Sequence, residues 1–242
     1  MNQNPDVAVT GNSPVAELIH SISNLYDNEV LSNFPDTNSL DNVLKHIIPN
    51  YYQKWKKKYI IDRQAWGHES VLQQLKKHLT NEVKIIVLVR PLEEILASFI
   101  RLSKTTNDNY LVRHSNDVDK QCDLLMQENG MIDLQLKSIK NLMKFENNGL
   151  SHFIEYDDLV KNPKEQLDKA YNFLGIDRFI HSFNDLKQVN LNGIMYNDNN
   201  YGMELHTIKT DLVMKSHYSI YDYLPKHIIE KCQSINFWQD RY

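Results

Sequence analysis

The stretch of sequence that decides the fold is Lys84-Ile85-Ile86-Val87-Leu88-Val89-Arg90-Pro91. A continuous apolar run ended by a charged residue and a proline predicts a parallel strand that feeds a helix. Arg90 then lies at the carboxyl edge of the sheet, where open α/β folds bind their ligands. Its guanidinium offers a planar fork for a phosphate, and the start of the next helix adds partial positive charge. The stretch therefore predicts a phosphate site at Arg90, and a solvated loop arginine is the competing interpretation.

A helical pattern follows directly after this strand. Ser98 comes eight residues after Arg90, and Glu94, Ser98 and Arg101 share one face of the helix. The buried stripe on another face is expected to consist of Leu92, Ile95, Leu96, Phe99 and Leu102. Ser98 and Arg101 are therefore expected to point the same way, one turn apart, although Ser98 could also be a small packing residue.

The second informative segment reads as a short strand, an acidic turn and a break. Tyr156 stands at the end of the strand, and Asp157 and Asp158 follow it. These two carboxylates are expected to cap a helix rather than to catalyse, because Asp accepts hydrogen bonds from free helix amides. Pro163 suits the first turn of the next helix, which is expected to end at Gly175.

Strand and helix patterns alternate along the chain without a clear linker. We expect helices over residues 14–26, 40–55, 68–79 and 116–145, a strand over 59–62, and a long functional or mobile loop over 183–204. This order predicts a single α/β domain over residues 1–242, in which helices flank a mostly parallel sheet.

The composition excludes several function classes. The chain has 242 residues, and its 41% hydrophobic content suits one globular core. A formal charge of −4 argues against a general nucleic-acid binder, and the basic run from Lys54 to Lys58 is expected at a solvated helix end or near an anion. No stretch approaches the roughly 20 apolar residues of a membrane span, and no signal peptide is visible, so we expect a cytoplasmic protein. Cys122 and Cys232 fit no metal-ligand spacing and predict reduced thiols.

The two segments together resemble the sulfotransferases that use 3'-phosphoadenosine 5'-phosphosulfate (PAPS). In that family a strand ends in Arg with Ser eight residues later, and a later strand ends in a Tyr-acidic-acidic-Leu block. An Asn-Pro or similar pair and a helix ending in Phe-Leu-Gly follow. This chain has the same order of features: Arg90, Ser98, Tyr156-Asp157-Asp158-Leu159, Asn162-Pro163 and Phe173-Leu174-Gly175. The resemblance spans nearly the whole chain and is closest to the bacterial and tyrosylprotein-type branch, although the family's Arg-Asp-Pro or Arg-Asn-Pro is here Arg90-Pro91.

The resemblance implies a P-loop-nucleotide-hydrolase-like fold and sulfuryl transfer from PAPS to an acceptor hydroxyl or amine, with no metal required. The acceptor would be a small molecule, a carbohydrate or a peptide. Arg90 and Ser98 would hold the 3'-phosphate, with Arg101 as a further ligand, because a dianion favours charge-assisted donors. Tyr156 would lie near the adenine, where an aromatic ring or a hydroxyl fits, and a core tyrosine is the alternative.

The resemblance also suggests catalytic residues. Arg63 stands where the family often has Lys or Arg after a strand, and it would stabilise charge in the transition state. An exposed arginine beside Trp66 is the alternative, and Asp62 could orient Arg63 or act as base. His206 belongs to a Leu-His-x-Ile-Lys element, from which His206 or Lys209 is expected to reach the active site.

Two parts of the family pattern are missing. In the tyrosylprotein branch the base is a Glu in the stretch where this chain has Asn12 and Ser13, neither of which is a competent base. The family also holds the 5'-phosphosulfate on a loop, typically Arg-Ser-Gly-Ser/Thr-Thr-Leu, after its first strand, and the chain has no such loop. None of its seven Gly residues stands in a G-x-x-x-x-G-K-[ST] or G-x-G-x-x-G motif. By the resemblance, the first strand, this loop and most of the first helix are expected to be missing.

Three functions compete on this basis. A PAPS-dependent sulfotransferase is the leading hypothesis, and the chain as it stands is expected to be inactive or nearly so. A non-catalytic remnant or nucleotide-binding module that keeps only the 3'-phosphate half-site is the alternative. A phosphoryl-transfer enzyme is disfavoured, because neither a Walker loop nor an Mg-binding pattern is seen. An uncovered sheet edge would also favour self-association.

Overall fold

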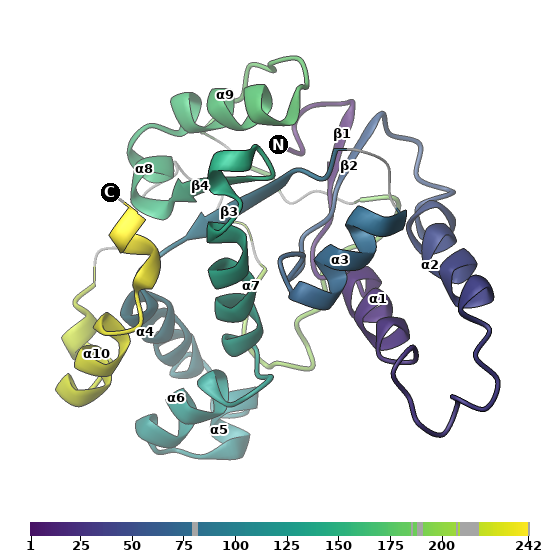
Figure 1. The fold of residues 1–242 in the computed structure, drawn as a ribbon. Helices are drawn as coiled ribbons and strands as arrows, with labels where there is room; N and C mark the ends of the chain where they lie inside the picture. The colour runs from purple at the N-terminus through teal and green to yellow at the C-terminus, as the bar shows by residue number, and fades with distance from the viewer. Residues whose placement is uncertain (79–81, 185, 188–190, 207, 209–217, 242) are drawn as a thin grey trace.

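The strands of the computed structural model pair as two parallel sheets (Figure 1). β1 (Val7–Val9) pairs with β2 (Tyr59–Ile61), and β3 (Ile85–Val89) pairs with β4 (Ser151–Glu155). The structure describes residues 1–78, 82–184, 186–187, 191–206, 208 and 218–241. The expected α/β class with parallel strands is confirmed, but within these ranges β2 and β3 do not pair, so the strands do not form one continuous sheet.

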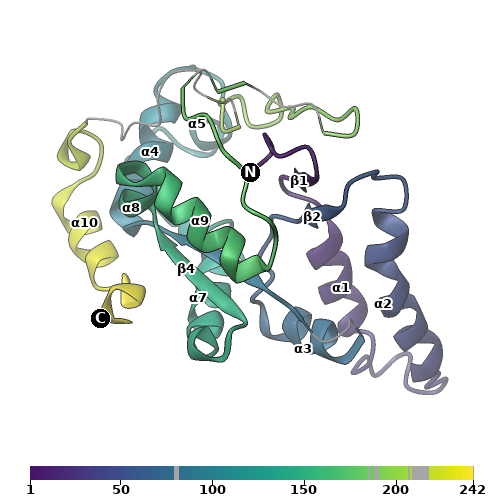
Figure 2. The same ribbon diagram turned by 90° about the horizontal axis from the view of Figure 1, so that it is seen from above.

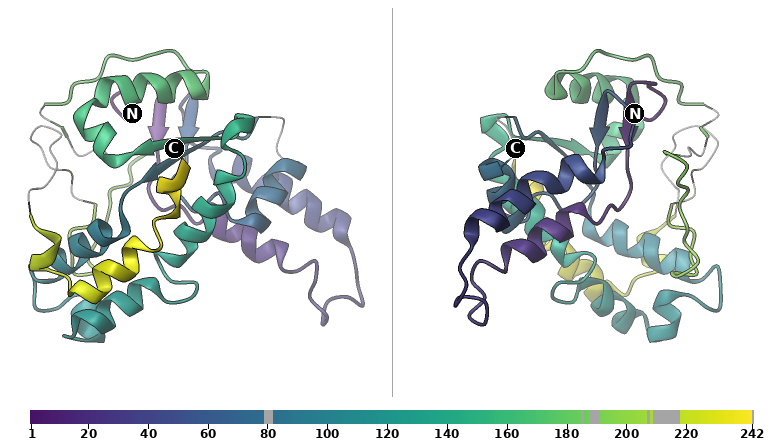
Figure 3. Two further views of the ribbon diagram at one scale, coloured as in Figure 1. Left: turned by 60° about the vertical axis from the view of Figure 1, so that its left-hand side comes forward. Right: turned by 90° about the vertical axis from the view of Figure 1, so that its right-hand side faces the viewer.

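Helices surround these strands. The α-helices in the described ranges are α1 (Val15–Ser23), α2 (Thr37–Tyr51), α3 (Glu69–His78), α4 (Leu92–Ser103), α5 (Tyr110–His114), α6 (Val118–Met126), α7 (Asp133–Met143), α8 (Tyr156–Lys161), α9 (Pro163–Leu174) and α10 (Lys226–Gln233). Figures 1 and 3 show α1, α2 and α3 together at one end of the molecule, and α4, α5, α6 and α10 together at the other.

The single helix expected over residues 116–145 is wrong, because the structure has two helices there. α6 ends at Met126 and α7 begins at Asp133. Between them Asn129 adopts a φ of 58°, and the Gly130 amide donates to the Gln127 carbonyl at 2.8 Å. Asn and Gly both favour turns, so this Asn-Gly pair ends the helical pattern. The helix expected over 40–55 is α2, which begins and ends earlier along the chain.

The acidic turn expected after β4 is instead the helix α8, which follows the strand without a break. Asp157 and Asp158 lie in its first turn, where the helix dipole favours negative charge. Their expected capping role is wrong, because Glu155 is the N-cap residue of α8 and its side chain makes no capping hydrogen bond there. α9 begins at Pro163 and ends before Gly175, whose φ of 71° is the left-handed conformation that glycine adopts readily. Residues 1–6 form turns.

The core fixes the orientation of α4. Leu92 and Leu96 of the expected apolar stripe are completely buried, and its other members are half-buried. Ile100, which was not expected in the stripe, is also completely buried. Because one face of α4 is held in the core, Ser98 and Arg101 are directed to the other side of the helix.

The start of α4 is closed by a residue from the other end of the chain. The buried Asn236 side chain accepts from the Leu92 amide at 2.9 Å and donates to the Glu93 carboxylate at 2.8 Å. The segment after α10 therefore caps the helix that carries Ser98 and Arg101.

The described residues of the expected loop contain no helix or strand, only one isolated bridge between Leu191 and Ile194. Residues 191–206 are anchored at the α4–α5 corner, where the Tyr110 amide donates to the Tyr201 carbonyl at 2.7 Å. The same segment reaches the end of β1, where Tyr196 packs against Gly11. Figure 2 shows this light green segment passing beside α5 and near β1.

Both cysteines are buried and free, as expected. Burial raises the pKa of the Cys122 thiol to about 12 and that of Cys232 to about 11, so both thiols are protonated at neutral pH. They lie on α6 and α10, two helices that are also joined by a contact of 2.8 Å between Asp119 and His227. Among the described helices, none has the length and apolar character needed to cross a bilayer.

We expect Asn236→Ala to lower the free energy of unfolding by about 1 to 3 kcal/mol, because it leaves a buried amide and a buried carboxylate without a partner. Urea denaturation measures this loss. Asn50→Ala, at an exposed position of α2, is the matched control and should change the stability by less than about 0.5 kcal/mol. Equal effects of the two variants would contradict the capping role.

We expect Gly202→Ala to be more destabilising than Gly149→Ala. Both glycines have a positive φ, 63° and 70°, so each substitution carries the left-handed penalty of about 1 to 2 kcal/mol. Only at Gly202 would the new Cβ clash, at 2.3 Å from the Asp108 carbonyl oxygen, which adds about 1 to 3 kcal/mol. Equal losses in urea denaturation would show that the anchor of residues 191–206 does not depend on this close approach.

Candidate active site

Arg90 and Tyr156 lie together at the carboxyl edge of the β3–β4 sheet. Val89 pairs with Glu155, so the residue that follows each strand is brought to the same place. The guanidinium carbon of Arg90 is 4.5 Å from the centroid of the Tyr156 ring, within the range of a cation–π contact. The sequence therefore predicted two residues that the structure places in contact.

The Arg90 guanidinium also pairs with the helix that follows it. Its Nε donates to Glu94 Oε2 at 2.9 Å, and only 19% of the Arg90 side chain is exposed. Burial opposes the positive charge, but the Glu94 hydrogen bond and the nearby Tyr218 and Tyr156 raise the pKa of Arg90 above its ordinary value. Arg90 is therefore a fixed cation, with Glu94 as its counter-ion.

Ser98 and Arg101 contribute donors beside this pair. Arg101 Nε is buried and has no hydrogen-bond partner, and no described residue bonds to the Ser98 hydroxyl. A buried unpaired donor costs about 1 to 3 kcal/mol, and more when it is charged. An anion bound at this face of α4 would satisfy Arg101 and remove that cost.

Tyr218 is a site residue that sequence reasoning missed. Its ring lies 5.2 Å from the Arg101 guanidinium carbon, and its hydroxyl lies 3.4 Å from the Glu94 carbonyl oxygen. Tyr218 precedes η2 (Ile220–Asp222) and belongs to no helical or strand pattern, so no signal in the sequence could have placed it. Glu94 was detectable, because its four-residue spacing from Arg90 is that of a helical ion pair.

The start of α4 is less available to an anion than its position suggested. The Leu92 amide already donates to Asn236, and Glu93 and Glu94 add negative charge in the first turn. The groups that could contact an anion on this face of α4 are therefore side chains rather than the backbone amides of its first turn.

A second group of candidate residues lies at the carboxyl end of β1 and β2. Arg63 follows β2, and its backbone amide donates to Thr10 Oγ1 at 3.3 Å, while its side chain is exposed. Asp62 accepts from the hydroxyls of Thr10 and Ser13, which ties the two strand ends together. This engagement of both carboxylate oxygens favours a structural role for Asp62 over that of a base.

His206 joins this second group from the segment 191–206. Its Nδ1 lies 2.6 Å from Asp198 Oδ1, and its Nε2 lies 3.1 Å from the side-chain nitrogen of Asn12. The Tyr196 ring stacks on the imidazole at 4.4 Å with an angle of 6° between the planes. The structure thus places His206 beside Asn12, just after β1.

The structure does not bring all candidate residues into one cluster. Arg90 and Tyr156 meet just before the start of α4, whereas Ser98 lies in the middle of that helix and Arg101 in its last turn. No described hydrogen bond or ion pair joins these four residues to Arg63 or His206. Lys209 lies outside the described residues. Asp198 and Tyr196 were missed, because the sequence showed them only as part of a long loop.

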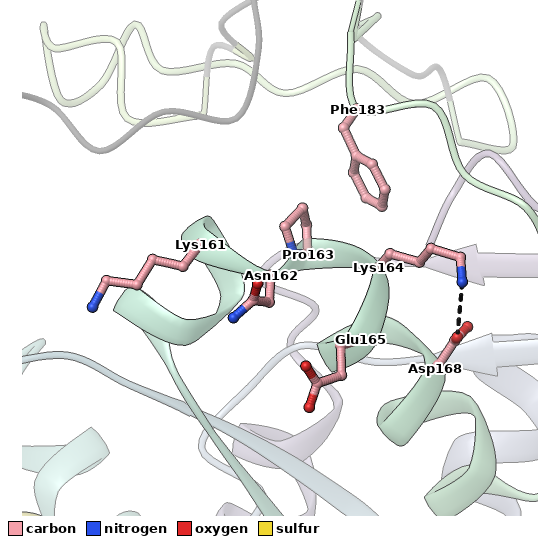
Figure 4. Close-up of a pocket in the computed structure, with 7 residues that line it drawn as sticks. All are labelled: Lys161, Asn162, Pro163, Lys164, Glu165, Asp168 and Phe183. Carbon is pink, nitrogen blue, oxygen red and sulfur yellow. Dashed lines mark ion pairs between the residues drawn. The ribbon is translucent and has the colours of Figure 1, made fainter.

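Two further features lie away from both groups. A shallow pocket lies where α8 meets α9, and Figure 4 shows the Phe183 ring above Pro163 there, with Lys161 pointing outward and Lys164 paired with Asp168. In the part of the chain that the structure describes, no three His, Cys, Asp or Glu side chains are grouped to hold a metal ion.

The basic run precedes β2, at the opposite end of that strand from Arg63. Lys57 Nζ donates to the Pro5 carbonyl at 2.7 Å, and Lys58 Nζ lies 5.0 Å from the centroid of the Tyr59 ring. These contacts place the run away from the carboxyl strand ends, where the candidate residues are.

Comparison with known proteins identifies the family. No curated protein sequence matches the chain. One similar solved structure, titled "Sulfotransferase Domain from the Curacin Biosynthetic Pathway", aligns with 18% identity and a TM-score of 0.37 over 68% of this chain. The chain spans 56% of that domain. The family described as "Sulfotransferase domain" matches residues 67–236, a range that includes Arg90, Ser98, Tyr156 and His206. The chain belongs to the sulfotransferase domain family.

Proposed function

We propose that this protein transfers a sulfuryl group from PAPS to the hydroxyl or amine of a small molecule, carbohydrate or peptide. Membership of the sulfotransferase family supports sulfuryl transfer. The observation that supports PAPS as the donor is the group of Arg90, Ser98 and Arg101, in which Arg101 Nε is buried without a partner. PAPS carries a 3'-phosphate apart from the sulfate that is transferred, and this phosphate would accept hydrogen bonds from these donors.

In this proposal the 3'-phosphate binds along the face of α4 that carries Ser98 and Arg101, beside Arg90. Arg90 provides its outer N–H groups, Arg101 provides its unpaired Nε, and Ser98 provides a hydroxyl. The buried face of α4 keeps these donors in a fixed arrangement, which lowers the entropy lost on binding. The Tyr156 ring packs against the Arg90 guanidinium, and its edge and hydroxyl would contact the adenine.

The proposed chemical step needs a base and a cation at the reacting sulfate. His206 would accept the proton of the acceptor, and Arg63 would stabilise negative charge on the sulfuryl group and the leaving phosphate. The exposed Arg63 side chain has no hydrogen bond to a described residue, so it is free to contact a ligand. Arg63 follows the carboxyl end of β2, and His206 contacts Asn12, which follows the carboxyl end of β1. This is the edge at which α/β folds bind their ligands.

A nucleotide-binding module without transfer activity is the second candidate function. It is favoured by the separation of the two groups of candidate residues, because no hydrogen bond or ion pair among the described residues joins Arg90, Ser98 and Arg101 to Arg63 or His206. Incubation of the purified protein with radiolabelled PAPS and a panel of acceptors separates the two candidates. Transfer at about 1 per second or faster supports the enzyme, and nucleotide binding without any transfer supports the module.

We expect Arg90→Ala to weaken the binding of adenosine 3',5'-bisphosphate by roughly 2 to 4 kcal/mol, the cost of removing one partner of a buried charge pair. Ser98→Ala should cost less, about 0.5 to 1.5 kcal/mol, because it removes one neutral hydrogen-bond donor. Isothermal titration calorimetry measures both affinities.

The matched control for Arg90→Ala is Arg113→Ala. Arg113 is a half-exposed arginine that pairs with Asp108 at 2.6 Å, away from the start of α4. Its substitution should leave the nucleotide affinity unchanged. An unchanged affinity in Arg90→Ala as well would remove the nucleotide assignment.

We expect Arg63→Ala and His206→Ala to reduce turnover by about 100-fold or more, because interactions made in the transition state appear in the rate constant. The affinity for adenosine 3',5'-bisphosphate should change by no more than about threefold, since neither residue contacts the 3'-phosphate group in this proposal. Steady-state kinetics and calorimetry are compared for each variant. Equal losses of turnover and affinity would mean that these residues bind the nucleotide instead.

A further inference from the structure

The His206 side chain is held on three sides by the described structure. Asp198 contacts it twice, through the ring Nδ1 at 2.6 Å and through the His206 backbone amide at 2.8 Å. Asn12 approaches the opposite ring nitrogen, Nε2, at 3.1 Å. Tyr196 stacks on the ring face. Only 12% of the His206 side chain and 15% of the Asp198 side chain are exposed, so the group is enclosed rather than spread over the surface.

The two polar neighbours select the same tautomer of His206. A carboxylate oxygen only accepts hydrogen bonds, so the ring must carry a proton on Nδ1 to bond with Asp198. The side-chain nitrogen of Asn12 only donates, so Nε2 must be the unprotonated nitrogen that accepts. A neutral imidazole with its proton on Nδ1 satisfies both contacts, and the other neutral tautomer satisfies neither.

We propose that Asp198 is the positioning residue that keeps the proton of His206 on Nδ1, so that Nε2 accepts the acceptor's proton in sulfuryl transfer. The inference rests on the proposed function and assigns the tautomer and partner of its base. The acceptor oxygen forms a bond to sulfur while the bond from sulfur to the phosphate oxygen breaks. The acceptor proton moves to Nε2, and adenosine 3',5'-bisphosphate leaves with the electron pair of the broken bond.

Asp198 suits this role in both states of His206. Burial opposes its charge, but the hydrogen bonds from the His206 ring and backbone hold the pKa of Asp198 below its ordinary value. The carboxylate therefore remains ionised at neutral pH, where it stabilises the imidazolium that forms during the step. Because Asp198 also binds the His206 backbone amide, the carboxylate cannot rotate away without losing a second bond.

The plane of the imidazole is fixed by Tyr196 and Gly11. A Cβ at Gly11 would lie 1.5 Å from the Tyr196 hydroxyl oxygen, so only glycine leaves room for the stacked ring. The Asn12 side-chain amide donates to Nε2, so it occupies the position from which an acceptor hydroxyl would donate. An acceptor hydroxyl that replaces Asn12 there would have its O–H directed at the base.

The decisive variant is Asp198→Asn, which keeps the size of the side chain and removes its charge. The new amide can donate to Nδ1, which favours the tautomer with the proton on Nε2 and blocks the base. Long-range ¹H–¹⁵N NMR of the full chain reads the His206 tautomer directly, at a pH where the ring is neutral. We expect Nδ1–H in the unmodified protein and Nε2–H in Asp198→Asn.

The variant that changes the His206 tautomer in the NMR spectrum should also lose turnover. We expect kcat to fall about 10²- to 10⁴-fold in Asp198→Asn, with the affinity for adenosine 3',5'-bisphosphate within about twofold of the unmodified protein. Asp198→Glu keeps the charge and should restore the Nδ1–H tautomer and part of kcat. Thermal unfolding of each variant establishes that the fold is retained.

The chain offers a matched control in a second His–Asp pair. Asp119 lies 2.8 Å from Nε2 of His227, but both side chains are exposed, 47% and 65%, and no aromatic ring of the described residues stacks on that histidine. Asp119→Asn should leave kcat and the His206 spectrum unchanged.

The possible failures can be told apart. An Nε2–H tautomer in the unmodified protein, or an unchanged kcat in Asp198→Asn, would overturn the inference about Asp198. An Nδ1–H tautomer together with no transfer to any acceptor would overturn the catalytic part of the inference and the proposed enzyme activity. Asp198 would then only fix the tautomer of the His206 ring.

Discussion

The parallel pairing of β3 with β4 is the interaction on which the candidate nucleotide site depends. Their register places Val89 opposite Glu155, and the residues that follow these two, Arg90 and Tyr156, meet at the edge of the sheet. A slip of one residue would turn every side chain of a strand to the other face. The pairing of two short strands therefore decides whether the cation and the ring meet at all.

Two long-range contacts then organise what surrounds that edge. Asn236 closes the start of α4 from the carboxyl-terminal segment, and residues 191–206 join the α4–α5 corner to the end of β1. The same segment carries Asp198 and His206. The segment 191–206 thus contacts both the corner after α4 and the end of β1. It is the irregular segment that lies between the two groups of candidate residues, which follow strands of different sheets.

The sequence could predict the parts of the site that lie within local strand and helix patterns. Arg90, Ser98 and Tyr156 stand at fixed distances from a strand end, so local spacing was sufficient to select them. Asp198 and Tyr218 could not be found in this way, because contacts with residues far along the chain place them. The break between α6 and α7 did have a local signal, the turn-forming pair Asn129-Gly130. It was overlooked because the helical pattern continues on both sides of it.

The ion pair between Arg90 and Glu94 has a consequence for how a ligand arrives. With its counter-ion already in place, Arg90 adds little net charge to this edge, and the whole chain carries a formal charge of −4. Long-range attraction therefore contributes little to the encounter with a polyanion. Capture must occur at short range, where a phosphate reaches the outer N–H groups of Arg90 while Nε stays paired with Glu94. Association of this kind is slow compared with steered encounters and depends only weakly on ionic strength.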